Sequence, residues 1–452
     1  MKQNRNHMKK TLLLAAAASL IGASPLMANT ADLYITGSTA FRANVHDACT
    51  KLFSSYTEYT GTPATGGDTK TGNAAAQWTL TGTAISGIGV STAANAFTIH
   101  ALFTGSVQGS QTVEQGTKLI FLKGTDATTT VTNTPTIAYS DASTLVTPYP
   151  VDGVTFQEEQ VAVLPFAMFR SPALAGIVTN VTWDQFRQII ANGRLPLSSW
   201  TGKSTDTGSY VYLIKRTKDS GTLRTETAEA GYSFGTGGAV YLYDVTNHLF
   251  YKGTNILNGA AGGTGGGASI GVVGPAGNNN ANESAVWGPG YVGGGDIGTV
   301  MKNADAQNLS ITMLSMSDGK SLTGSQWSQQ IPFCGVWPTA AGAGITTAVT
   351  NDWTPYTSGQ FPLWGYEICV YPLEDPSLLH NDQNLSVTEL GDQNTPGTIL
   401  GLLDGQSYTA GSLYYEIQNS KTGILGTTAP ATAILISDMH ATRTAVGGPI
   451  AP

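Results

Sequence analysis

The chain has 452 residues, enough for two domains, and 41% of them are hydrophobic, so it can form a core and is not globally disordered. Only 12% are charged while 55 are glycine, which disfavours coiled coils, helical bundles and nucleic-acid binders. The formal net charge of −8 also argues against nucleic acid and anionic membranes as partners.

The N-terminus has the pattern of an export signal. Four Lys and Arg residues within the first ten precede an apolar run over 12–21, and Ala28 precedes the expected cleavage site. The apolar run is too short to anchor the chain in a bilayer, and no Cys follows it closely to accept a lipid. We therefore expect a signal peptide over 1–28 and a periplasmic or secreted protein.

Beyond the signal, the apolar pattern predicts strands that alternate with helices, which indicates α/β layers. Strands are predicted over 32–36, 97–103, 119–122, 136–139, 161–166, 210–215, 311–316, 333–337, 365–371 and 433–436. Helices are predicted over about 39–53, from a capping box at 182–185 to Gly193, and from 219 to about 231. Residues 58–95 are expected to form a hairpin or loop, and the Gly- and Asn-rich tract over 253–298 a surface insertion.

The three cysteines, Cys49, Cys334 and Cys369, match no zinc or redox spacing. Cys49 falls on the apolar side of the first predicted helix, where we expect a buried thiol. Cys334 and Cys369 lie in strand-like runs, and we expect them to form a disulfide in an oxidising compartment, with three free thiols as the alternative.

Four loops place small hydroxyl or Gly residues between a strand end and a helix start. They are 37–39, 105–109, 220–222 and 294–296. Helix N-termini carry unpaired N–H groups and a partial positive charge, so they bind oxyanions without needing Lys. One such loop is typical of a plain helix cap, whereas four, with Arg216 four residues before one of them, indicate an anion site.

These loops carry a family resemblance. The order Ile-Thr-Gly-Ser-Thr-Ala-Phe (35–41), Gly-Ser-x-x-Gly (105–109), Tyr-Ser-Asp-Ala (139–142) and Arg-x-x-x-Ser-Gly-Thr (216–222) resembles the phosphate-binding proteins of bacterial ABC transporters. The most specific piece is 215–222, which is similar to that family's Arg-containing Ser-Gly-Thr anion loop. The resemblance covers the chain from about 32 to 371.

The resemblance implies a type II periplasmic-binding fold, in which two α/β lobes joined by two crossovers close on a ligand. On this basis 29–155 form the first part of lobe I, 156–330 form lobe II with the insertion, and 331–452 return to lobe I and form a tail. The resemblance implies nine ligand-binding residues: Ser38, Thr39, Phe41, Ser106, Asp141, Arg216, Ser220, Gly221 and Thr222.

In that set Arg216 would pair with two ligand oxygens, and Asp141 would select the ligand. A carboxylate repels an anion unless a proton lies between them, and phosphate can supply that proton whereas sulfate cannot. Each residue also has a structural alternative. These are an Asx turn for Asp141, a salt bridge of Arg216 to Asp219 or Glu226, and helix N-caps for Ser38 and Ser106.

The sequence contains little that indicates an enzyme. The six histidines lack metal-ligand spacing, and there is no Gly-x-Ser-x-Gly elbow, phosphate-loop motif or paired carboxylate pattern. We expect no catalysis, metal or cofactor. The leading hypothesis is an exported, monomeric substrate-binding protein that captures inorganic phosphate or a similar tetrahedral oxyanion for an ABC permease. The alternative is a secreted or surface interaction protein that reuses this scaffold, which the insertion and the missing lipid site favour.

Overall fold

The computed structural model describes residues 31–61, 71–85, 97–150, 156–217, 219–233, 238–244, 248–252, 290–291, 293–319, 329–339, 353–372, 433–434, 436–443 and 445–451. The expected signal peptide and most of the expected insertion lie outside these ranges, as does most of the C-terminal tail. Within them, none of the helices combines the length and the hydropathy needed to cross a membrane.

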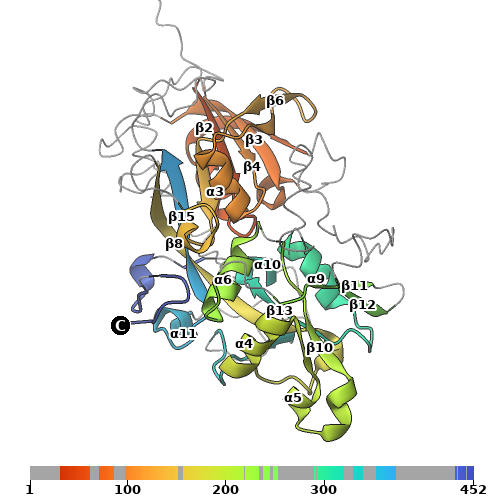
Figure 1. Ribbon diagram of the computed structural model, residues 1–452. Helices are drawn as coiled ribbons and strands as arrows, with labels where there is room; N and C mark the ends of the chain where they lie inside the picture. Colours follow the sequence, from red (N-terminus) through yellow and green to blue (C-terminus); the bar gives the residue numbers. More distant parts are fainter. Residues whose placement is uncertain are drawn as a thin grey trace, which may run out of the picture.

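A large mixed sheet runs through the molecule, and 11 strands of the described residues take part in it (Figure 1). In spatial order they are β2 (Phe53–Thr60), β3 (Gln77–Ala84), β4 (Phe97–Leu102), β1 (Ala31–Gly37), β7 (Ile137–Ser140), β15 (Trp364–Pro372), β8 (Phe156–Arg170), β13 (Ser310–Ser315), β10 (Tyr210–Leu213) and β9 (Arg194–Pro196), with β14 (Gln330–Ile331) also beside β8. The pairs β1–β4, β1–β7 and β10–β13 are parallel, and the other pairs are antiparallel.

Strand β8 joins two lobes. Its first part pairs with β15, from Phe156 opposite Pro372 to Pro165 opposite Trp364. Its last part pairs with β13, where Phe166 lies opposite Ser315. The chain returns to the first lobe through α11 (Thr354–Thr357) and β15. Together with the mixed sheet, this arrangement confirms the predicted two-lobed α/β fold with two connections between the lobes.

Helices cover both faces of the sheet. The first lobe has α2 (Arg42–Thr50) and α3 (Ser106–Glu114), and the second has α4 (Trp183–Asn192), α5 (Ser198–Thr201), α6 (Gly221–Glu229), α9 (Gly294–Lys302) and α10 (Met316–Gly319). Short 3-10 turns are η1 (Gly72–Ala74), η2 (Thr144–Val146), η3 (Pro172–Leu174), η4 (Ser204–Gly208) and η6 (Ile436–Asp438). Two hairpins stand beside the sheet, β5 (Leu119–Leu122) with β6 (Thr130–Asn133) and β11 (Tyr241–Asp244) with β12 (Leu249–Lys252).

Helices α2 and α3 lie on opposite faces of the first-lobe sheet. Val113 of α3 packs with Ala138, whereas Val45 of α2 belongs to the cluster that contains Tyr139. Consecutive residues of a strand point to opposite faces, so the two helices cannot share one. The connections that leave β1 and β4 therefore diverge at the carboxyl ends of these parallel strands, which is where ligand sites of open α/β sheets commonly lie.

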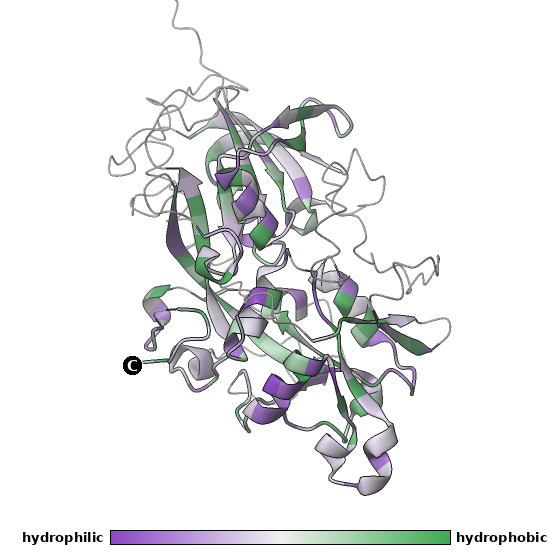
Figure 2. Ribbon diagram, viewed as in Figure 1, coloured by the Kyte–Doolittle hydropathy of each residue, from purple (hydrophilic) through white to green (hydrophobic). Residues whose placement is uncertain are grey.

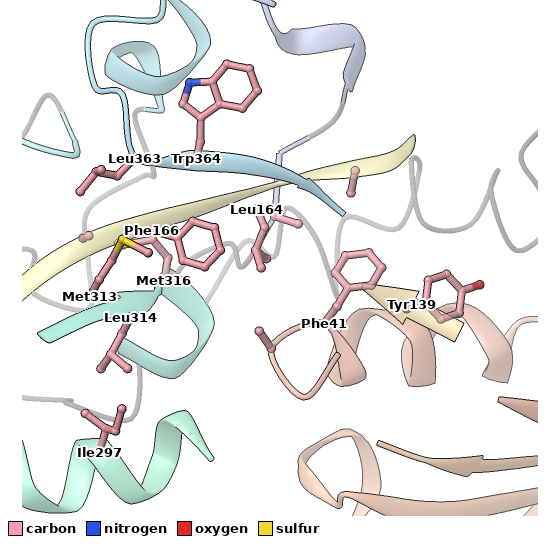
Figure 3. Packing of buried hydrophobic residues seen from close by; sticks show 14 of the residues in the cluster. Phe41, Tyr139, Leu164, Phe166, Ile297, Met313, Leu314, Met316, Leu363 and Trp364 are labelled. Atoms are coloured by element: carbon pink, nitrogen blue, oxygen red, sulfur yellow. The ribbon is translucent and has the colours of Figure 1, made fainter. Parts of the chain in front are cut away.

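One hydrophobic cluster extends through both lobes. Figure 2 shows hydrophobic residues concentrated on the strands and hydrophilic ones on outer helices such as α4. Figure 3 shows Leu164 of β8 between Phe41 of the first lobe and Phe166, which lies near Met313 of the second. The lobes thus share a core along β8.

Several predicted elements are confirmed in detail. The capping box is present: Gln185 N donates to Thr182 Oγ1 at 3.2 Å, and Thr182 N donates to Gln185 Oε1 at 2.9 Å. Gly193 ends the helix in the left-handed region at φ 75°. Within the stretch over 58–95 that was expected to form a hairpin or loop, β3 pairs antiparallel with β2, which begins earlier, at Phe53.

Three predicted elements are wrong. In place of the strand over 433–436, Ile434 forms an isolated bridge with Val163 and a 3-10 turn begins at Ile436. The first helix starts at Arg42 and ends at Thr50, because Phe53 leaves it and begins β2. The predicted strand over 333–337 is a tight turn. Val336 N donates to Phe333 O at 3.0 Å, and Cys334 and Gly335 both have positive φ.

The expected disulfide is also wrong, because none of the three cysteines is bridged to another. Cys369 is buried in β15, opposite Tyr139 of β7 and Glu159 of β8. Cys334 lies in the second lobe, where its backbone N–H donates to Val181 O at 2.8 Å. The two thiols therefore belong to different lobes. Cys49 is buried as predicted, and burial raises its pKa strongly.

We expect one thiol to react in the native protein. Cys334 is exposed, whereas Cys49 and Cys369 are buried, and only an accessible thiolate attacks a disulfide reagent. Titration with an aromatic disulfide reagent should count one fast thiol in native protein and three in denaturant without reductant. One thiol in denaturant would instead demonstrate a disulfide.

Candidate functional site

Five loops from both lobes meet at one place, here called the junction. They are 38–41, 105–107, 140–141, 216–217 with 219–222, and 315–318. In Figure 1, α3 approaches this place from the first lobe, and α6 and α10 approach from the second. Val107 N of α3 donates to Asp219 O at 3.0 Å, and Ser317 Oγ donates to Ala40 O at 2.8 Å. The two lobes are thus in direct hydrogen-bonded contact at the junction.

Asp141 lies at the centre of the junction, directly after β7. Its carboxylate accepts hydrogen bonds from Ser106 Oγ and, at 3.0 Å, from Thr222 Oγ1. Its carbonyl accepts from Thr225 Oγ1 at 3.0 Å. Asp141 therefore connects the N-terminus of α3 in the first lobe to that of α6 in the second. The local turn is closed by Ser140 instead, whose Oγ accepts from Ala142 N at 3.3 Å, so the Asx-turn alternative is not what holds Asp141.

Gly221 allows this approach. A Cβ at this position would lie 1.7 Å from Asp141 Oδ1 and 2.8 Å from Ser106 Cβ. No side chain fits there, so the start of α6 can come against Asp141 only because residue 221 lacks one. The sequence Ser-Gly-Thr thus has a separate task for each residue: Ser220 Oγ accepts from Leu223 N at 3.4 Å and caps α6, Gly221 admits the carboxylate, and Thr222 donates to it.

Arg216 reaches across the junction from the end of β10. Its Nη2 donates to Thr39 Oγ1 of the first lobe at 3.2 Å, and its Nη1 lies 3.7 Å from Asp318 Oδ2 of the second. The Arg216 and Asp318 side chains are only 3% and 5% exposed. Arg216 thus lies beside a carboxylate, as the salt-bridge alternative expected, but this carboxylate is that of Asp318, which was not an expected partner. Glu226, which was, faces Lys215 instead.

The segment that carries Arg216 is fixed by Tyr291. Thr217 N donates to Tyr291 O at 3.0 Å, and Tyr291 N donates to Lys215 O at 3.1 Å. Tyr291 is fully buried, so these bonds are shielded from water. The guanidinium is therefore presented by a backbone that is held on both sides of Arg216.

The groups of the junction act on the pKa of Asp141 in opposite directions. Burial raises its pKa, while the Ser106 hydrogen bond, the Arg216 charge and the Thr222 hydrogen bond lower it, and the Asp318 charge raises it again. The net direction is upward. Helices α3 and α6 both begin here, and each contributes roughly half a positive charge at its start.

The remaining predicted residues have other partners. Phe41 N donates to Ser38 O and to Ser38 Oγ, both at 3.3 Å, and the Phe41 ring is fully buried. Ser38 thus accepts hydrogen bonds within the turn before α2, a role similar to the helix N-cap that was its structural alternative. Ser106 does not cap α3, because its hydroxyl donates to Asp141.

Two carboxyl groups were missed by the sequence analysis. Asp318 follows β13 in the run Ser-Met-Ser-Asp-Gly over 315–319, which repeats the Ser-Asp pattern after β7 and was the available signal. Glu367 is a single acidic residue within the apolar run of β15, and its side chain is fully buried. The fourth predicted loop faces Asp318, since a Cβ on Gly294 would lie 2.0 Å from Asp318 Oδ2.

Within the described ranges, no group of three or more His, Cys, Asp and Glu side chains could hold a metal ion. No protein-family model matches the chain, and no curated protein matches it. Solved structures of phosphate-binding proteins show a distant likeness. A proposed phosphate ABC transporter substrate-binding protein with bound phosphate from Clostridium perfringens is 13% identical, with a TM-score of 0.34, over 78% of this chain and 88% of that chain.

A possible phosphate-binding protein from Planctomyces limnophilus is 10% identical, with a TM-score of 0.33, over 77% of this chain and 83% of that chain. The high-affinity periplasmic phosphate-binding protein PfluDING is 11% identical, with a TM-score of 0.34, over 89% of this chain and 96% of that chain. At these identities and TM-scores the likeness does not establish what this chain binds.

Proposed function

We propose that the junction binds inorganic phosphate, or a similar tetrahedral oxyanion that carries a proton, and that the protein delivers this ligand to an ABC permease. The observation that supports the proposal most is the convergence of Arg216, Ser106, Thr222 and two helix N-termini around Asp141 from separate loops of two lobes. A buried guanidinium with hydroxyl donors is the chemistry that recognises oxyanions. Placement between lobes suits a ligand that is captured and released.

In this proposal, Asp141 selects ligands that carry a proton. Ser106 and Thr222 now donate to Asp141, so an oxyanion that takes these donors leaves the carboxylate without them. A buried carboxylate that loses its donors and faces an anion is strongly destabilised. A ligand that donates its own proton to Asp141 removes that penalty. Hydrogen phosphate can do so near neutral pH, and sulfate cannot.

The selectivity of the Asp141→Asn variant tests this assignment. Asparagine keeps the size of the side chain but can donate, so sulfate binding should improve relative to phosphate by about 2–3 kcal/mol. Phosphate affinity should fall less. The measurement is displacement of labelled phosphate by sulfate in wild type and variant. As a matched control, Asp126→Asn changes an exposed Asp held by the N–H groups of Thr128 and Thr129, and should leave the ratio unchanged. An equal ratio in wild type and Asp141→Asn would contradict the role of Asp141.

Delivery to a permease distinguishes transport from the alternative of an interaction protein that reuses the scaffold. The gene of a transport protein is expected beside permease and ATPase genes, and its deletion should abolish high-affinity phosphate uptake. Phosphate binding without either result would favour the interaction protein.

A further inference from the structure

Glu367 is a fully buried residue in the strand next to the junction. It is the fourth residue of β15, opposite Ala162 of β8, and its neighbour Ile368 is paired with Ser140, the residue before Asp141. Its side chain has no exposed surface. Within the described residues neither carboxyl oxygen has a hydrogen-bond partner of good geometry, although Ser38 lies close enough to lower its pKa.

The charges of the junction do not balance if Glu367 is ionised. Arg216 would then be accompanied by three carboxylates, those of Asp141, Asp318 and Glu367, before any anion arrived. Buried groups in this situation stay neutral by keeping a proton. Burial accordingly raises the pKa of Glu367 well above its ordinary value, and the charge of Asp141 raises it further.

The groups around Glu367 come from every element packed against it. Strand β7 contributes Tyr139 and is followed by Asp141, the loop before α2 contributes Ser38, and β8 contributes the uncharged Ala162. In the described residues, the interactions that reach the Glu367 carboxyl come from the Ser38 hydroxyl, the Tyr139 phenol and the Asp141 carboxylate, and no cation is among them.

We propose that Glu367 determines when the junction can hold its anion: the site accepts phosphate while Glu367 is protonated and rejects it once Glu367 is ionised. This inference rests on the proposed phosphate site. The proton comes from solvent and stays on the Glu367 carboxyl, so no other co-reactant is needed. Its consequence is a phosphate affinity that falls at alkaline pH, where phosphate itself remains the dianion.

The sign follows from linkage. Each proton that the complex holds and the free protein loses makes affinity fall tenfold per pH unit above the pKa of the free protein. Wild-type affinity for the phosphate dianion should therefore be independent of pH below the raised pKa of Glu367 and fall toward that limiting slope above it. Glutamine at 367 is a permanently neutral isostere, so Glu367→Gln should keep its neutral-pH affinity across the whole range.

The experiment is calorimetric titration of the full-length protein with inorganic phosphate from pH 7 to pH 10. Glu159→Gln is the matched control, because Glu159 is a half-buried carboxyl on the adjacent strand β8 and its pKa is also raised by burial. It should behave as wild type. At the pH where wild-type affinity declines, titrations in two buffers of different ionisation enthalpy should also show net proton uptake, and this readout needs no variant.

The outcomes separate this inference from the function it rests on. An absence of phosphate binding at every pH overturns the proposed function and takes this inference with it. Phosphate binding that falls equally at alkaline pH in wild type and Glu367→Gln overturns the role of Glu367 alone. If Glu367→Gln does not fold, a wild-type affinity that is flat to pH 10, or a decline without proton uptake, overturns it as well.

Discussion

Replacing Arg216 with alanine is expected to weaken phosphate binding by about 1.5–3 kcal/mol, which is roughly 10- to 150-fold. Arg216 supplies the principal positive charge of the junction and contacts both lobes through Thr39 and Asp318. Its side chain is 3% exposed, so water cannot replace it. The measurement is calorimetric titration of wild type and variant with inorganic phosphate at the same pH.

Stability has to be separated from binding in this variant, because alanine leaves the buried Asp318 without its guanidinium. The double variant Arg216→Ala/Asp318→Asn removes both charges and should recover stability but not phosphate affinity. Arg187→Ala is the control for loss of an arginine, since Arg187 is exposed on α4 and stacks on Trp183 at 5.8 Å. Wild-type phosphate affinity in the double variant would show that Arg216 has only a structural role.

Replacing Gly221 with alanine should disrupt the junction severely. The new Cβ would overlap Asp141 Oδ1 at 1.7 Å and crowd Ser106 at 2.8 Å, so α6 must move away from the carboxylate. Overpacking of this kind costs about 1–3 kcal/mol of folding stability, and the displaced Thr222 and helix N-terminus should abolish measurable phosphate binding. Urea unfolding and phosphate titration of the same sample measure the two effects.

Gly295→Ala is the matched control for this substitution. Gly295 also lies in the first turn of a nine-residue helix, α9, but nothing approaches its Cβ position within 4 Å. Alanine there should be neutral or stabilise the protein by up to about 1 kcal/mol, with unchanged binding. If Gly221→Ala behaves like Gly295→Ala, the close contact between α6 and Asp141 is not a feature of the protein in solution.

Local signals in the sequence predicted much of the fold correctly. The capping box at Thr182 and Gln185 is local chemistry, and it defined α4. The alternation of strands and helices predicted the α/β class. The first helix was overextended, because Phe53 fits a helical period as well as a strand, and only pairing with Ala84 of β3 decides between them. Such long-range pairing is not visible in a single sequence.

The candidate site was predictable only where it is built from motifs. The spacing of Arg216 to Ser-Gly-Thr placed these residues on one loop, and Ser106 and Asp141 do meet them. Asp318 and Glu367 are not part of a comparably long motif. Each is a single carboxyl group whose importance depends on residues that are close in space but distant in sequence. The disulfide expectation failed for a related reason. Cys334 and Cys369 both lie in strand-like runs of the sequence, yet β15 returns to the first lobe and Cys334 stays in the second.

Titration of the purified protein with inorganic phosphate at pH 7.5, followed by calorimetry, tests the central claim most directly. We expect saturable binding of one phosphate per chain, with sulfate at the same concentration giving little heat. We also expect that Gly221→Ala loses this binding while Gly295→Ala retains it. Absence of saturable heat with phosphate, or binding that survives in Gly221→Ala, would contradict a phosphate site at the junction.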